Sequence, residues 1–185
     1  LRIRMNFKIQ AIRLTLAAVL CCISMFANAV KGNVEKSGDI GLLALPLLAY
    51  SSTFYLEDEQ GRNEFYKSIL STALVTQLLK ITVRKKRPIE DSYTSFPSGH
   101  AAIAFQSATF IEQRYGWKYG LPAFAAATYV GWTRVESKQH YTIDVLAGAA
   151  IGALTSLYFT TPYNGVHITP YAKNRSYGVE FSSTF

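Results

Sequence analysis

The segment KITVRKKRP, residues 80–88, gathers side chains that are well suited to binding a phosphate group. Lys80, Arg84 and Arg87 follow one another at spacings of four and three, so a helix would present them on one face until Pro88 ended it. The planar guanidinium of arginine can contact two phosphate oxygens at once, and lysine adds a compact positive charge. The segment therefore predicts an oxyanion site, although a basic cluster attracted to acidic lipid headgroups fits these residues equally well.

A second segment, SFPSGHAAIAF at residues 95–105, predicts the start of a helix with a histidine in its first turn. Ser98 occupies the place of a helix N-cap, and Gly99 leaves the backbone open to close approach by a ligand. The first N–H groups of this helix and its dipole would attract an anion, and His100 would stand beside that anion. The alternative is a simple turn and cap with His100 on the surface.

A third segment, TRVESKQHYTIDVLAG at residues 133–148, pairs a histidine with a carboxylate. His140 and Asp144 are four residues apart, so Asp144 could accept a hydrogen bond from one ring nitrogen and fix the tautomer. The other nitrogen would then be free to act as a nucleophile or base, and Arg134 would add a further positive charge. Taken alone, such a pair also occurs as a simple helix-stabilising contact.

Five helical segments are expected to position these residues. Apolar periodicity, interrupted by Pro, Gly and charged stretches, predicts a loop at 57–63 and helices at 39–56, 64–83, 98–115, 119–135 and 140–159. We therefore expect an all-α fold, a compact up-and-down bundle of about five helices. Neighbouring helix ends alternate in such a bundle, so the three segments would meet at one end of it.

The N-terminal residues 1–29 are typical of a signal peptide or an N-terminal membrane anchor. Lys8 and Arg13 precede an uncharged stretch, and Ala27-Asn28-Ala29 has the small residues of a cleavage site. Either interpretation places the protein in a bacterial cell envelope, in the periplasm or in the inner membrane facing it. The two cysteines of the chain lie in this leader, so a cleaved protein would hold no thiol and no disulfide.

Two further regions follow the leader. Residues 30–162 would form the helical domain, and residues 163–185 a C-terminal tail. In the tail, β-branched and aromatic residues flank residues 173–176, which is a weak β-hairpin pattern.

Composition leaves open whether the bundle spans a membrane. The 185 residues are 49% hydrophobic and 17% charged, yet only the run after Asp144 approaches the ~20 apolar residues of a membrane span. The acidic 57–63 loop also opposes the usual preference for positive charge on the cytoplasmic side. A membrane-embedded bundle and a soluble periplasmic bundle both fit the sequence.

The three segments together favour one kind of chemistry. They combine several cations, a helix N-terminus and two imidazoles with a single carboxylate. This set suits the binding of a phosphoryl group and its transfer to histidine. No cluster of Asp or Glu is available to hold Mg²⁺, so we expect neither a metal nor another cofactor, and no nucleic acid partner.

The same segments resemble the three-part signature of the type 2 phosphatidic acid phosphatase superfamily, which includes bacterial acid phosphatases and vanadium haloperoxidases. Lys-x6-Arg-Pro corresponds to residues 80–88, and Pro-Ser-Gly-His to residues 97–100. Ser-Arg-x5-His-x3-Asp corresponds to residues 133–144, where Thr133 replaces the usual serine.

The resemblance implies a role for each matched residue. His140 would attack phosphorus and form a phosphohistidine, Asp144 would orient it, and His100 would protonate the leaving group. The phosphate would be held by Lys80, Arg87, Ser98, Gly99 and Arg134. Arg84 and His167 have no counterpart in the signature and are assigned no catalytic part.

Three functions therefore remain open at the level of sequence. The first is a metal-independent phosphatase at the periplasmic face of the membrane, acting on a lipid phosphate or diphosphate monoester. The alanine-rich run after His100 is similar to the lipid-phosphate branch of the family. The second is a soluble, non-specific periplasmic acid phosphatase. The third is a non-enzymatic envelope module that docks through its C-terminal tail.

Overall fold

The computed structural model describes residues 34–163, together with the backbone of two strands at residues 166–173 and 176–183. The predicted leader at residues 1–29, with both cysteines, lies outside the described residues.

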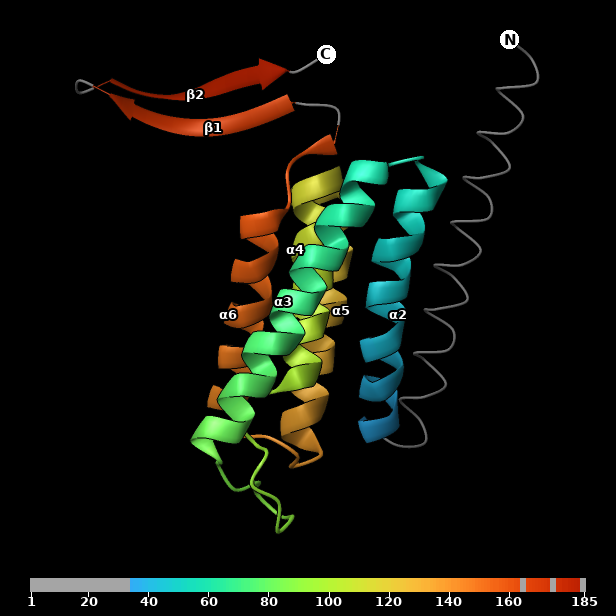
Figure 1. Ribbon diagram of the computed structural model, residues 1–185, viewed down its shortest axis with the longest axis vertical. Helices are drawn as coiled ribbons and strands as arrows, with labels where there is room; N and C mark the ends of the chain where they lie inside the picture. The colour runs from blue at the N-terminus through green and yellow to red at the C-terminus, as the bar shows by residue number, and fades with distance from the viewer. Residues whose placement is uncertain (1–33, 164–165, 174–175, 184–185) are drawn as a thin grey trace.

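The described residues form a bundle of five α-helices that run alternately in opposite directions (Figure 1). These are α2 (Val34–Tyr55), α3 (Glu59–Val83), α4 (Gly99–Tyr115), α5 (Trp117–Glu136) and α6 (Thr142–Phe159). Helix α4 is central and packs against each of the other four. The predicted all-α, up-and-down architecture is confirmed.

Two helices, α2 and α3, each begin five residues earlier than predicted. Helix α2 begins at Val34, so Asp39 lies inside the helix rather than at its start. Helix α3 begins at Glu59, and most of the predicted 57–63 loop is its first turn. The carboxylate of Asp58 caps this turn by accepting a hydrogen bond from the N–H of Gly61 at 2.8 Å. The glycine and the charges suggested a loop because this capping contact is not visible in composition.

Helices α4 and α6 pack backbone against backbone. A Cβ atom at Gly148 would lie 2.3 Å from the Ser98 carbonyl oxygen, and one at Gly152 would lie 2.0 Å from that of Ala102. Small residues four apart allow this close approach between helices. As a result, the N–H of Ser98 donates a 2.9 Å hydrogen bond to the carbonyl of Asp144, which joins two of the predicted functional segments.

The core of the bundle is built largely from small apolar residues with a few aromatic rings. One cluster between α2, α4 and α5 contains Leu45, Ala104, Ala108, Ala123, Ala127 and Val130. A second cluster joins Ala49, Phe65 and Phe110, whose two rings meet edge to face with centroids 5.0 Å apart. These small residues allow the helices to pack close to one another.

The outer faces of the bundle carry many exposed apolar side chains. Those away from the helix ends include Leu43, Leu47, Leu70, Leu74 and Leu154. Exposed aromatic residues stand nearer the two ends, among them Tyr55, Trp117, Tyr119, Trp132, Tyr141 and Tyr158. Among the described residues, α6 is long and apolar enough to cross a membrane by length and composition.

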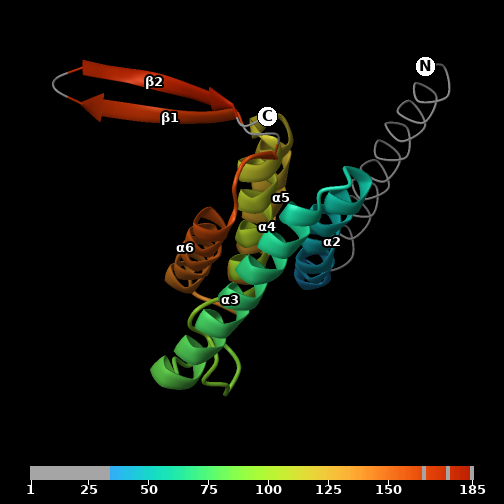
Figure 2. The same ribbon diagram turned by 45° about the horizontal axis from the view of Figure 1, so that its top comes forward.

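Two strands follow α6. Strands β1 (Val166–Lys173) and β2 (Ser176–Ser183) pair antiparallel, with Val166 opposite Ser183 and Lys173 opposite Ser176. They correspond to the predicted hairpin. They lie beyond the end of the bundle that is opposite the α3–α4 loop (Figures 1 and 2).

Candidate active site

All three predicted segments lie at one end of the bundle, the lower end in Figure 1. This end is formed by the last turn of α3, the 84–98 loop, the first turn of α4, the last turn of α5 and the first turn of α6. The first turns of α2 lie at the same end (Figure 1). The alternating helix directions thus bring together residues that are far apart in the sequence.

The basic segment is not one continuous helix. Helix α3 ends at Val83, and Arg84 adopts the left-handed conformation with φ of 47° while its N–H bonds to the Lys80 carbonyl. The expectation that Lys80, Arg84 and Arg87 share a helix face is therefore wrong. Pro88 disfavours a helical conformation for Arg87, and the chain turns away before reaching it.

The 84–98 loop is held by backbone hydrogen bonds and by Lys80. The N–H of Arg87 donates to the Ser92 carbonyl, and the N–H of Ser95 donates to the Lys85 carbonyl, each at 2.9 Å. Lys80 Nζ donates to the carbonyls of Thr94 and Pro97, both at 2.7 Å. Lys80 therefore joins the end of α3 to the chain that leads into α4.

Arg87 extends from this loop toward the segment before α6. Its Nη1 donates to Glu90 at 2.8 Å and to the side-chain oxygen of Gln139, the neighbour of His140. Its buried Nε has no hydrogen-bond partner among the described residues. A buried guanidinium N–H without an acceptor is costly, so this donor is well suited to an anionic ligand.

The start of α4 is capped as predicted and has open space beside it. The buried Ser98 Oγ accepts a long hydrogen bond, 3.4 Å, from the N–H of Ala101. A Cβ atom added at Gly99 would lie 3.9 Å from its nearest neighbours, the side chains of Lys80 and Thr76. The space next to the first N–H groups of α4 is therefore bordered by a lysine.

His140 is held in a defined tautomer. Its Nδ1 lies 2.6 Å from the backbone carbonyl of Ser95, and a carbonyl only accepts, so Nδ1 carries the proton. The lone pair of Nε2 is then available for attack. Burial, assisted by the positive charges of Lys80 and Arg87, lowers the pKa of His140 to about 4. The imidazole is thus neutral at ordinary pH, which is the form that can act as a nucleophile.

Asp144 reaches His140 indirectly. The predicted hydrogen bond from the imidazole to Asp144 is wrong, because the Ser95 carbonyl takes that place. The buried Asp144 carboxylate accepts from Lys85 Nζ at 2.7 Å, from Ser95 Oγ at 2.5 Å and from the Tyr141 N–H at 3.1 Å. It caps the start of α6 and so turns away from the ring. Asp144 therefore fixes Ser95, which in turn orients His140.

Sequence reasoning missed Lys85. Its ammonium group neutralises Asp144 and lies 4.4 Å from the centre of the Tyr141 ring. Lys85 lies inside the basic 80–88 segment, which could have indicated a role in the site. The helical spacing instead selected Lys80, Arg84 and Arg87.

Sequence reasoning also missed Asp39 on α2. Its Oδ1 lies 2.9 Å from His100 Nε2 and accepts a hydrogen bond of 2.9 Å from Arg134 Nη1. Arg134 Nη2 also donates to the carbonyl of Glu35 on the same helix. Since Nε2 of His100 is engaged, Nδ1 is the ring nitrogen left to exchange a proton with a ligand.

A cavity of about 290 Å³ opens beside His100 between α2, α3 and α4. Lys80, Gly99 and His100 border it together with Thr76 and Gln77, and its apolar wall is formed by Leu42, Ala73 and Ile103. It therefore joins groups that can hold a phosphate to a surface that can hold a hydrocarbon chain.

The charges of this end act on both histidines. Arg87 influences His100 and His140, and the backbone N–H of His140 donates to the Arg134 carbonyl at 3.1 Å. Among residues 34–163, no three His, Cys, Asp or Glu side chains are grouped so that they could hold a metal ion. The groups able to neutralise a phosphate here are side-chain cations and helix N–H groups.

Comparison with known proteins gives a family and several relatives. A family model described as "PAP2 superfamily" matches residues 64–166, which include α4, α5 and α6 but not α2. The chain is 33% identical over 167 residues to the lipid A 4'-phosphatase of Helicobacter pylori, covering 80% of this chain and 84% of that protein. It is 33% identical over 106 residues to the lipid A 1-phosphatase of Porphyromonas gingivalis, covering 51% of this chain and 24% of that protein.

A solved structure shares the fold. The crystal structure of Aquifex aeolicus LpxE matches with a TM-score of 0.52 and 22% identity, covering 65% of this chain and 83% of that one.

Proposed function

Because the chain belongs to the type 2 phosphatidic acid phosphatase superfamily, we propose that it hydrolyses a lipid phosphate monoester through a phosphohistidine intermediate. The observation that carries this proposal is His140, whose Nδ1–H is held by the Ser95 carbonyl while Nε2 keeps its lone pair. The similarity to a lipid A 4'-phosphatase over most of both chains makes the phosphate of a lipid A-type glycolipid the first substrate to test. Lipid diphosphates form the second group.

In the first step, Nε2 of His140 attacks phosphorus. The N–P bond forms as the P–O bond to the lipid breaks, and negative charge develops on the phosphoryl oxygens. Lys80, Arg87 and Arg134 neutralise that charge, and Ser98 and the backbone N–H of Gly99 donate hydrogen bonds at the start of α4. Ser95 and Asp144 keep the imidazole in place.

His100 supplies and recovers the proton. Its Nδ1–H protonates the departing lipid oxygen, which would otherwise leave as a high-energy alkoxide. In the second step a water molecule gives its proton to His100 and attacks the phosphohistidine. The P–N bond breaks, inorganic phosphate is released, and both histidines return to their starting forms.

The surface of the bundle supports a membrane location for this chemistry. Helices of 17 to 25 residues are about 25 to 38 Å long, and the hydrocarbon layer is about 30 Å thick. Exposed leucines cover the middle turns, and aromatic residues such as Trp117 and Trp132 stand near opposite ends of α5. In water this surface would promote aggregation, which argues against the soluble acid phosphatase and against an interaction module alone.

We place the site on the periplasmic side. If the predicted leader carries the chain outward, α2 starts at the periplasmic face. The first turns of α2 lie at the same end as His140, so the active site would face the periplasm (Figure 1).

Phosphate release from a substrate panel tests the function. The detergent-purified protein is offered lipid A, phosphatidic acid, a prenyl diphosphate and water-soluble phosphate esters, with and without EDTA. We expect hydrolysis of a lipid phosphate at a rate that EDTA leaves unchanged. Activity confined to soluble esters would refute the lipid assignment, and activity that needs added Mg²⁺ or Zn²⁺ would refute the proposed phosphate site.

A further inference from the structure

Helix α2 contributes a carboxylate to the candidate site from outside the matched family region. Asp39 lies 25 residues before the first matched residue, Glu64. One oxygen of Asp39 meets both His100 Nε2 and Arg134 Nη1, each at 2.9 Å. The same carboxylate thus contacts the proposed proton donor and a proposed phosphate ligand.

The neighbouring turn of α2 is shaped around Arg134. A Cβ atom at Gly38 would lie 2.0 Å from Thr133 Oγ1 and 2.2 Å from Arg134 Nη2, so only glycine leaves room for the guanidinium. Arg134 is 2% exposed, and the Glu35 carbonyl accepts from its Nη2. Three residues of α2 therefore accommodate Arg134: Glu35 accepts a hydrogen bond through its carbonyl, Gly38 leaves space for the guanidinium, and Asp39 accepts through its carboxylate.

We propose that Asp39 is a positioning residue that orients His100 and favours its protonated form for donation to the leaving group. The inference rests on the proposed function. The Asp39 carboxylate accepts Nε2–H, which directs Nδ1–H toward the substrate. When the P–O bond breaks, the Nδ1 proton moves to the lipid oxygen, and the neutral ring keeps its Nε2–H bond to Asp39.

The charges around His100 make this partner important. Arg134 from α5 and Arg87 from the 84–98 loop act on the ring, and Lys80 from α3 borders the same cavity. Burial and the positive charges of Arg134 and Arg87 disfavour the imidazolium, whereas the Asp39 carboxylate favours it. Without the Asp39 charge, His100 would give up its proton at a lower pH.

The test substitutes Asp39→Asn and compares an alkyl or glycolipid phosphate with p-nitrophenyl phosphate. A poor leaving group depends on protonation and a good one does not, so we expect kcat to fall about 10²-fold on the alkyl phosphate and only a few-fold on the aryl ester. The alkaline limb of the alkyl profile should move to lower pH. Asp91→Asn is the matched control, because Asp91 is an exposed carboxylate of the 84–98 loop that pairs with Lys86. It should change neither.

Two further measurements separate positioning from structure. In a His100→Ala background, Asp39→Asn should cause no additional loss, because the group that Asp39 orients is gone. Equal losses on both substrates with an unchanged pH profile would overturn the proposal and make Asp39 a structural partner of Arg134.

A readout that does not depend on activity keeps the two proposals distinguishable. ¹⁵N NMR of His100 should report a proton on Nε2 in the wild type and titration at lower pH in Asp39→Asn. Failure of the phosphatase assay would refute the proposed function, whereas an unchanged His100 titration would refute the role of Asp39.

Discussion

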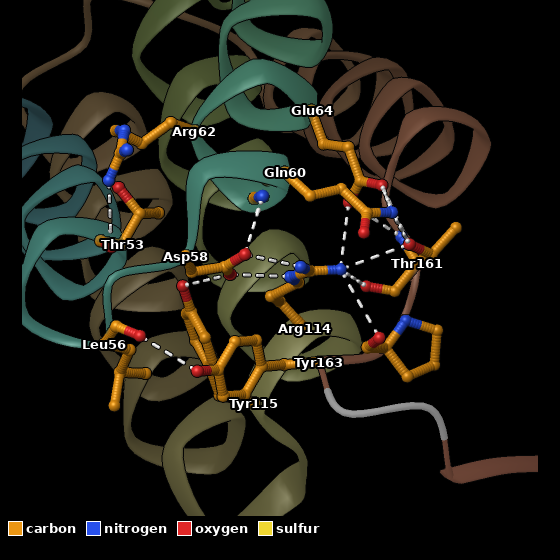
Figure 3. Close-up of polar contacts among 12 residues, drawn as sticks. Thr53, Leu56, Asp58, Gln60, Arg62, Glu64, Arg114, Tyr115, Thr161 and Tyr163 are labelled. Atoms are coloured by element: carbon orange, nitrogen blue, oxygen red, sulfur yellow. Dashed lines mark hydrogen bonds and ion pairs between the residues drawn. The ribbon is translucent and has the colours of Figure 1, made fainter. Parts of the chain in front are cut away.

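The two ends of the bundle each bury an arginine, but they use it differently. At the end away from the histidines, Arg114 binds both oxygens of Asp58 through Nε at 2.7 Å and Nη2 at 2.5 Å (Figure 3). Its Nη1 donates to the Thr161 carbonyl at 2.7 Å and lies 3.4 Å from Glu64. At the other end, Arg134 shares the single carboxylate of Asp39, whose side chain is 52% exposed.

The comparison shows how a purely structural ion-pair cluster, formed by Arg114, Asp58 and Glu64, differs from a candidate site. Around Arg114 the protein supplies two carboxylates for one guanidinium. Burial alone would raise the pKa of Asp58, but hydrogen bonds from Arg114 and from the Gly61 N–H outweigh it and lower this pKa. Charge is balanced there by fixed partners that join α3, α4 and the end of α6. At the other end, Lys80, Arg87 and Arg134 are held by carbonyls, an amide and exposed carboxylates, which a phosphate can replace.

The largest expected effect follows from removing the nucleophile. His140→Ala should abolish turnover, by at least about 10⁴-fold, on every substrate, since the proposed mechanism needs this nucleophile whatever the leaving group. Asp144→Asn should retain weak activity, because Asp144 acts through Ser95. Labelled phosphate should be trapped on the wild type and lost in acid. Acid-stable label, typical of phosphoserine, would contradict the scheme.

The next largest effect is expected from disrupting the ion-pair cluster of Arg114, Asp58 and Glu64, which should lower stability without removing any residue of the candidate site. Arg114→Leu leaves Asp58 and Glu64 buried without their cation, so the free energy of unfolding should fall by about 3–5 kcal/mol. Arg134→Leu should instead reduce activity strongly with a smaller loss of stability, because water can solvate the half-exposed Asp39. Thermal denaturation and phosphate release of both variants measure this. Equal destabilisation by the two substitutions would remove the distinction between the ends.

A pair of glycine substitutions on neighbouring helices tests the same difference between a packing contact and the candidate site. Gly152→Ala places a Cβ 2.0 Å from the Ala102 carbonyl, so α6 must shift and stability should fall by about 1–3 kcal/mol or more. Gly99→Ala meets nothing closer than 3.9 Å, so it should fold normally and weaken phosphate binding by filling the space beside α4. Vanadate inhibition together with thermal denaturation tests both. A stable Gly152→Ala protein would contradict the close packing of α4 and α6.

The smallest expected effect concerns pH. Burial and the charges of Lys80 and Arg87 lower the pKa of His140 to about 4, and the ring is a nucleophile only when neutral. Activity should therefore persist as pH falls through 6.5 and be lost only toward pH 4, as the acid limb of kcat/KM would show. Lys86→Gln, at an exposed lysine paired with Asp91, serves as the control and should leave this limb in place. An acid limb near 6.5 would indicate a solvated imidazole.

Much of this architecture follows from local sequence. Helical periodicity predicted the five helices, and the alternating direction of successive helices was enough to bring Lys80, Ser98, Arg134 and His140 to one end. Cap chemistry at Ser98 was likewise predicted, because an N-cap depends on residues adjacent in the chain.

Contacts between distant segments depended on the tertiary structure. The sequence by itself determined which residue types reach the end of the bundle that holds the candidate site. Helical spacing, however, predicted a direct hydrogen bond between Asp144 and His140 and placed Arg87 on the same helix as Lys80. The fold instead inserts the Ser95 carbonyl, pairs Asp144 with Lys85 and brings Asp39 from α2 to His100. The reason is physical: hydrogen bonds are satisfied by whichever donor or acceptor the packing brings near. That is decided by the close approach of α6 to α4 and by the left-handed turn at Arg84.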